Sequence, residues 1–166
     1  MKWVWILGGA LIFLVAVIAL IGALLPQSHT ATRRARFRQR PEAVYAAISG
    51  PPDWRSDVKG SGVLPNGRWW EQDSHGNKVT FELVEDRPPT RRTVRIADQK
   101  LPFGGAWTFE IAPEADGSTL RITENGEIYN VIFRFVARFF LGYTSSIENH
   151  LRDLGRKFGE TVQIEE

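Results

Sequence analysis

The sequence predicts an α+β protein in which an antiparallel sheet packs on a long C-terminal helix, behind one N-terminal transmembrane helix. Three observations support this fold class. A run without any charged residue covers residues 3–25. Several later segments alternate apolar and polar residues, the period of two that half-buried strands show. In the last part of the chain apolar residues recur with a period close to 3.6, which indicates an amphipathic helix.

The uncharged run is long enough to cross a bilayer, whose hydrocarbon core needs about 20 apolar residues in a helix. It is longer than the core of a signal peptide, and no small-residue cleavage site follows it. We interpret residues 1–26 as an uncleaved transmembrane anchor, with a cleaved signal peptide as the alternative. Residues 27–29 are then a linker, residues 30–160 one folded domain and residues 161–166 a tail.

Basic residues flank this run unequally. Lys2 precedes it, whereas a cluster of arginines follows it before the first carboxylate at Glu42. The cluster comprises Arg33, Arg34, Arg36, Arg38 and Arg40. Because cytoplasmic flanks of membrane spans are rich in Lys and Arg, we predict a single-pass cell-membrane protein with a cytoplasmic C-terminal domain. The whole chain carries a formal charge of only +2, and no broad basic surface indicates nucleic-acid binding.

The domain is expected to begin with a strand and two short helices. Residues 30–39 alternate, which places an arginine-rich face outward. Pro41 suits the first turn of a helix, and the two prolines after Gly50 prevent its continuation. Asp53 is a suitable N-cap for a second short helix at residues 53–58, which Trp54 would fix to the core.

Strands dominate the middle of the chain. Their alternation is typical of an antiparallel sheet with one face in water. We expect them at residues 60–64, 67–73, 77–86, 91–99, 105–113 and 118–129. The last segment has Asn130 as a cap, and its periodicity predicts one long helix over residues 135–158, buried against the sheet.

The segment RFRQRPEAVYAAISGPPDWRSDV resembles the entry signature of the START-like or SRPBCC superfamily, the polyketide cyclase/dehydrase and lipid-transport group. The matching positions are Pro41, Glu42, Val44, Tyr45, Ile48, Asp53 and Trp54. The resemblance implies a helix-grip fold, in which a curved antiparallel sheet wraps around the C-terminal helix. It also implies a cavity for an apolar ligand between sheet and helix. It implies fold more strongly than chemistry, because such folds host many functions.

Aromatic and aliphatic residues on the expected inner faces are candidates for lining that cavity, with ordinary core packing as the alternative. These ligand-binding candidates are Trp69, Phe81, Trp107, Phe109, Phe140, Tyr143 and Ile147. Tyr143 adds a hydroxyl that would orient a ligand. The segment at residues 133–140 (FRFVARFF) carries more apolar residues than one buried helical stripe needs. Arg134, Arg138 and Phe139 in that segment are candidates for membrane contact, and gating of the cavity is a further possibility.

Catalytic signals are weak. The parity of its strand places Glu124 inward, where a pocket carboxylate would act as acid or base, and Arg92 is a possible partner. The alternative is a solvated strand end. His29, His75 and His150 are expected in a linker, a hairpin turn and a helix. They show no metal-ligand spacing, and the chain has no cysteine. We therefore expect neither metal nor cofactor.

Binding is favoured over catalysis on these grounds. The favoured hypothesis is a membrane-anchored binding protein for an apolar small molecule or lipid. The alternatives are an enzyme of the cyclase/dehydrase kind that uses Glu124, and a non-catalytic interaction module.

Overall fold

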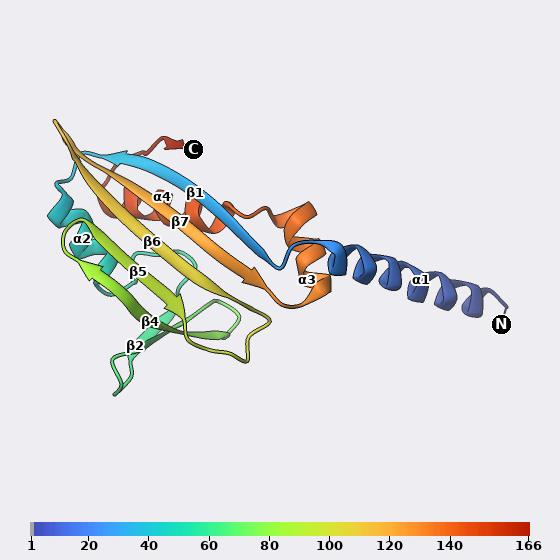
Figure 1. The fold of residues 1–166 in the computed structure, drawn as a ribbon. Coiled ribbons are helices and arrows are strands. Elements are labelled where there is room, and N and C mark those ends of the chain that lie inside the picture. The colour runs from blue at the N-terminus through green and yellow to red at the C-terminus, as the bar shows by residue number, and fades with distance from the viewer. Residues whose placement is uncertain (1) are drawn as a thin grey trace.

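The computed structural model of the protein describes residues 2–166, which form an α+β fold with an eight-stranded antiparallel sheet. Figure 1 shows α1 projecting from one end of the sheet, α2 at the opposite end and α4 lying across one face. The predicted fold class is correct in these coarse features.

The sheet contains the six strands expected from residues 60 onward, together with β1 and a short β8. The strand order is β2-β3-β4-β5-β6-β7-β1-β8. The strands are β1 (Ser28–Phe37), β2 (Gly60–Val63), β3 (Trp69–Gln72), β4 (Lys78–Arg87), β5 (Arg91–Ile96), β6 (Phe103–Glu114), β7 (Gly117–Ile128) and β8 (Ile164–Glu165). From β2 to β7, strands that are consecutive in the chain are also adjacent in the sheet. The first strand, β1, pairs along its whole length with β7.

Two helices, α1 and α2, precede the strands β2 to β7 in the sequence. Helix α1 (Lys2–Leu24) is 23 residues long and is apolar enough to cross a membrane. Helix α2 (Pro41–Ser49) begins at the proline that the sequence places in its first turn, and Gly50 caps its end. Its buried residues are Val44, Tyr45 and Ala47.

The C-terminal helical segment is divided, so the expectation of one long helix over residues 135–158 is wrong. It consists of α3 (Val131–Val136), the π-helical turn η1 (Ala137–Leu141) and α4 (Ser145–Lys157). Gly142 has a φ of 74°, a left-handed conformation that glycine adopts without steric cost and that ends the helix. Only α4 packs across the sheet; α3 packs beside the C-terminal end of α1 (Figure 1).

The core lies between α4 and the concave side of the sheet. Ile147, Leu151 and Leu154 are spaced three or four residues apart on α4, so they share one face, and all three are buried. They meet Leu120 and Ile122 of β7, which alternate on the inner face of the sheet. This contact fixes α4 over β1 and β7 and leaves the opposite half of the sheet to be covered by other segments.

Three smaller expectations differ from the structure. The second short helix at residues 53–58 is replaced by turns. Tertiary contacts hold that segment: the Trp54 indole donates to the Ala47 carbonyl at 3.3 Å, and the Ser56 amide donates to the Asp153 carboxylate at 2.6 Å. The segment expected as a linker enters β1 at Ser28, and the expected tail pairs with β1 through β8.

Candidate ligand-binding site

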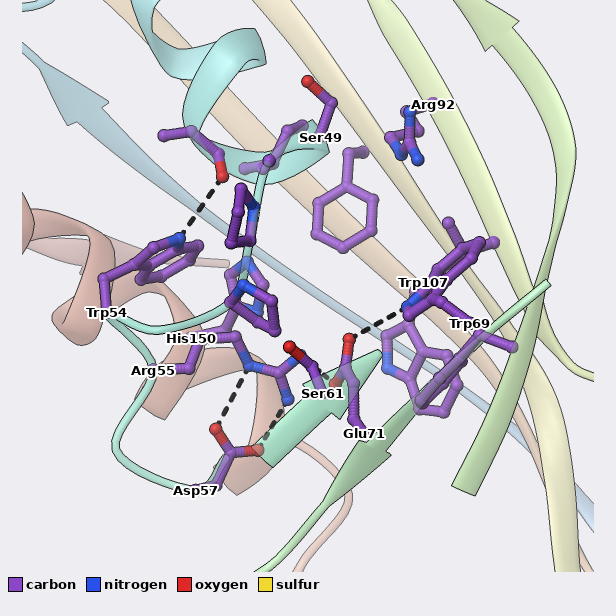
Figure 2. Close-up of a pocket in the computed structure, with 18 of the residues that line it drawn as sticks. Ser49, Trp54, Arg55, Asp57, Ser61, Trp69, Glu71, Arg92, Trp107 and His150 are labelled. Carbon is purple, nitrogen blue, oxygen red and sulfur yellow. Dashed lines mark hydrogen bonds and ion pairs between the residues drawn. The ribbon is translucent and has the colours of Figure 1, made fainter. Parts of the chain in front are cut away.

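A cavity of about 690 Å³ lies beneath the half of the sheet that α4 leaves open. Its walls come from the end of α2, the 50–57 segment, the strands β2 to β7 and the first turns of α4. Figure 2 shows Trp54, Arg55 and His150 on one side and Trp69, Trp107 and Arg92 on the other. Sites for drug-sized molecules have volumes of roughly 300–1,000 Å³, so the cavity has the size of a small-molecule site.

The structure brings together most of the aromatic residues that the sequence analysis selected. The cavity is lined by Trp69, Phe81, Trp107, Phe109 and Ile147. Register explains this: Trp69 lies opposite Phe81 in the β3–β4 pairing, and their rings stack with centroids 5.8 Å apart. Trp107 on β6 meets Phe81 edge-on, with centroids 6.2 Å apart.

Two selected residues lie elsewhere. Phe140 is in η1 and is 74% exposed, and it does not line the cavity. Tyr143 follows Gly142, and its ring stacks on His29 at a centroid distance of 4.0 Å. Both were assigned to the cavity on the assumption of one continuous helix, and the break at Gly142 turns them away from it.

One wall of the cavity carries an ion-pair cluster that the sequence analysis missed. The Arg55 guanidinium donates to Glu71 and to Asp57, each at 2.6 Å, and the Trp69 indole donates to Glu71 at 3.1 Å. Burial alone would lower the pKa of Arg55, but the two carboxylates raise it above its ordinary value. Burial alone would raise the pKa of Asp57, yet its hydrogen bonds with Arg55 hold it below its usual range. The charges of Arg55 and Asp57 are therefore stabilised, and the cluster is internally paired.

Arg92 lines the opposite wall and has a different partner from the one expected. Its guanidinium lies 3.3 Å from the Asp86 carboxylate and 5.9 Å from the centre of the Trp69 ring. The Tyr45 hydroxyl donates to the same carboxylate. Pairing of Arg92 with Glu124 was thus a wrong expectation, because β4 supplies a nearer carboxylate.

His150 is the most unusual residue of the cavity. Its ring packs edge-on against Trp54, with centroids 5.0 Å apart, and lies 5.3 Å from Phe109. Among residues 2–166, its Nε2 is the one fully enclosed side-chain nitrogen or oxygen without a hydrogen-bond partner. Burial, and secondarily the positive charge of Arg55, lower the pKa of His150 to about 3. The imidazole is therefore neutral near pH 7, and Nε2 can accept a hydrogen bond or donate one, depending on the tautomer.

Glu124 faces inward, as the alternation along its strand predicts. Its Oε2 accepts hydrogen bonds from the Trp107 indole at 3.0 Å and from the Ser146 hydroxyl at 2.8 Å. Its Oε1 lies 3.6 Å from His29 Nε2. His29 was expected in a linker but belongs to β1. The carboxylate is not part of the cavity lining.

The residues selected for membrane contact divide into two groups. Arg138 and Phe139 are exposed on η1. Arg134 is only 8% exposed, and its guanidinium donates to backbone carbonyls, which include that of Ile128 at 3.0 Å. Its guanidinium is thus occupied within the protein, a placement that differs from the expected contact with lipid headgroups.

The sequence analysis did not select Arg55, Glu71 or His150 as cavity residues. Arg55 and Glu71 are far apart in sequence, and only the fold of the 50–57 segment over β3 brings them together. His150 could have been selected from its position three residues after Ile147, which places both on one helical face. No group of three or more His, Cys, Asp or Glu side chains suited to a metal ion occurs within residues 2–166.

Comparison with known proteins identifies the architecture alone. No protein-family model and no curated protein matches the sequence. A conserved protein from Geobacillus kaustophilus superimposes with a TM-score of 0.68 and 11% identity, over 83% of this chain and 100% of that one. A protein from Mesorhizobium loti gives a TM-score of 0.63 and 16% identity, over 79% and 97%.

Norcoclaurine synthase from Thalictrum flavum gives a TM-score of 0.61 and 9% identity, over 81% of this chain and 88% of the enzyme. That enzyme has a fold of the Bet v1 or SRPBCC type, so the domain shares the general architecture of that fold. Membership of the START-like superfamily stays a prediction.

The enclosed His150 should make stability depend on pH. Between pH 6.5 and about 3 the unfolded chain binds a proton that the folded chain excludes, so acidification lowers the free energy of unfolding by about 1.4 kcal/mol per pH unit. We expect the loss between pH 6.5 and 4.5 to be roughly 2 kcal/mol larger in the wild type than in His150→Gln. Denaturant unfolding of the detergent-solubilised protein measures it, and equal losses in the two proteins would contradict the assignment.

Proposed function

We propose that this chain is a single-pass membrane protein whose domain binds an uncharged, largely apolar small molecule or lipid in the cavity between the sheet and α4. The observation that carries the proposal is the cavity itself, about 690 Å³ in volume and walled by aromatic rings. Burial of apolar surface contributes about 25 cal/mol per Å², so an apolar ligand that covers these rings gains its affinity from contact area.

The charges around the cavity support an uncharged ligand. Each charged side chain that lines it has a partner of opposite sign: Arg55 with Asp57 and Glu71, Arg68 with Glu82, and Arg92 with Asp86. An ionised ligand would have to compete with these pairs, whereas a neutral ligand leaves them intact.

His150 supplies a polar contact for such a ligand. Its enclosed Nε2 has no partner, and an unsatisfied buried polar group costs about 1–3 kcal/mol. A small rotation of the ring would open this nitrogen to the cavity, where a hydroxyl or carbonyl group of the ligand would remove that cost. The ligand chemistry that fits best is therefore an apolar body with a neutral hydrogen-bonding group.

Helix α1 provides the membrane location in this proposal, since its length and composition suit a bilayer span. Apolar molecules concentrate in bilayers, so an anchored domain keeps its cavity beside the ligand's reservoir. The domain is proposed to be cytoplasmic. Three of the arginines that follow α1 belong to β1, where Arg33 pairs with Glu148 and Arg34 with Glu165. The whole cluster still lies on the same flank of the span.

Binding explains the site better than the enzymatic alternative. Both Glu124 oxygens face donors or His29, and the carboxylate does not line the cavity. A cavity of this volume also favours ligand binding over an interaction module with a vestigial site.

Ligand binding can be tested by filling the cavity. Ile48 lines it at the end of α2, whereas Ala46 is exposed on the same helix, so Ile48→Trp and Ala46→Trp form a matched pair. In native mass spectrometry of the detergent-purified full chain, we expect a bound neutral molecule in the wild type and in Ala46→Trp, and at least tenfold lower occupancy in Ile48→Trp.

Charge selectivity is tested with two probes of the same shape. Calorimetric titration should show that 2-naphthol binds the wild type at least tenfold more tightly than 2-naphthoate, with Ile48→Trp as the blank for detergent partitioning. Absence of any bound molecule, together with equal heats in wild type and Ile48→Trp, would overturn the proposed function.

The side of the membrane is tested by reporter fusions at the C-terminus. The unequal arginine flank predicts a fluorescent green fluorescent protein fusion and an inactive alkaline phosphatase fusion in a bacterial host. The reverse pattern would place the domain outside and make Lys2 the cytoplasmic flank.

A further inference from the structure

We propose that α3 and η1 form a second membrane contact beside α1, and that Arg134 joins α1 to the domain so that this surface is held against the bilayer. The inference rests on the proposed function in one respect, namely that α1 spans the membrane. It adds a named lipid-facing surface and a fixed orientation of the cavity domain.

The joint is built on the C-terminal end of α1. The last carbonyls of a helix have no partner within the helix. Arg134 Nη1 donates to the carbonyl of Gly22 in the last turn at 3.3 Å and to that of Leu25, just after the helix, at 3.0 Å. A positive charge at this place also complements the negative end of the helix dipole.

The same guanidinium is fixed to the sheet. Its Nε donates to the Ile128 carbonyl at 3.0 Å and its Nη2 donates to the Tyr129 carbonyl at 3.3 Å, both at the end of β7. Arg134 therefore connects the anchor helix and the sheet through backbone atoms, which do not rotate away as side chains do.

Close packing reinforces this joint. Gly22 is the buried residue of α1, and a side chain at this position would overlap the backbone carbonyl of Val131. The absence of a Cβ lets α3 approach the last turn of α1 directly. The chain between α1 and β1 adds little freedom, because the Gln27 carbonyl already accepts a hydrogen bond from the Ile128 amide.

Beyond the joint, α3 and η1 expose an apolar surface to solvent. It consists of Ile132, Phe139, Phe140 and Leu141, which are 44%, 57%, 74% and 54% exposed. None of these residues lines the cavity. Exposed Arg138 lies within the same turn, as expected of a segment that meets both apolar chains and anionic headgroups.

Continuity with α1 identifies the bilayer as the partner of this surface. Figure 1 shows α3 against the C-terminal end of α1, the level at which a spanning helix leaves the hydrocarbon core, and η1 continues directly from α3. Phenylalanine and leucine side chains at that level enter the membrane interface without any movement of the domain. A second copy of the chain or another protein is a competing occupant that the experiment separates.

The chain has no cysteine, so single labelling sites can be introduced freely. We would attach an environment-sensitive fluorophore to Phe140→Cys, to Leu14→Cys in the middle of α1 and to Ala46→Cys on α2, at the far end of the domain. Each full-length protein is placed in vesicles of phosphatidylcholine and phosphatidylglycerol that carry nitroxide-labelled lipids.

We expect lipid nitroxides near the headgroups to quench the label at position 140 at least threefold more than the label at position 46. The label at position 14 should respond most to nitroxides deep in the acyl chains. If position 14 is quenched and position 140 matches position 46, the second contact is wrong and the anchor stands. If position 14 is not quenched, the spanning role of α1 fails instead. Protection of position 140 from aqueous iodide without lipid quenching would assign the surface to a protein partner and overturn the proposal.

The role of Arg134 is tested in the Phe140→Cys background. Arg134→Met and Arg134→Lys should lower quenching at position 140 at least twofold, with tryptophan emission of the cavity residues as the check that the domain stays folded. Arg138→Ser, which keeps the joint, should keep most of the quenching. Unchanged quenching in both folded Arg134 variants would show that Arg134 does not orient the domain.

Discussion

The break at Gly142 is the constraint on which the rest of the structure depends. It divides one apolar helical segment between two partners. After the break, α4 buries Ile147, Leu151 and Leu154 against the sheet. Before it, α3 packs beside the end of α1, and the η1 turn that follows exposes phenylalanines to solvent. A continuous straight helix could not pack on both the sheet and the end of α1, because all of its apolar residues would follow a single helix axis.

The cavity follows from the same division. Helix α4, which begins only at Ser145, packs on β1 and β7, and α2 contacts β6 and β7, so β3 to β5 are left without an extensive helix contact. The 50–57 segment closes that side, held by the Arg55 ion pairs and by the Ser56 contact with Asp153. Aromatic rings from β3, β4 and β6 face the space between them. The paired charges and the neutral His150 give the cavity its preference for an uncharged ligand in this account.

Much of the fold was predictable because its strands are half buried. Alternation placed all six strands from β2 to β7, and it gave the inward direction of Glu124, Trp107 and Phe109. The division of the C-terminal helix was not predictable from periodicity, because the apolar spacing continues across Gly142 and only the backbone conformation reveals the break. Phe140 and Tyr143 lie outside the cavity lining for that reason. Partners such as Arg55 with Glu71, or Arg134 with Gly22, depend on contacts between distant segments that no local pattern encodes.

The central claim is that α1 and the cavity domain form one rigid body, and a distance measurement across the joint tests it most directly. Spin labels at Ala10→Cys on α1 and Ala46→Cys on α2 can be measured by double electron–electron resonance in lipid nanodiscs. The account predicts a single distance peak no wider than that of a control pair within the domain, Ala46→Cys with Ser74→Cys. A distribution several times wider than the control would show that the domain moves freely on its anchor and would contradict the account.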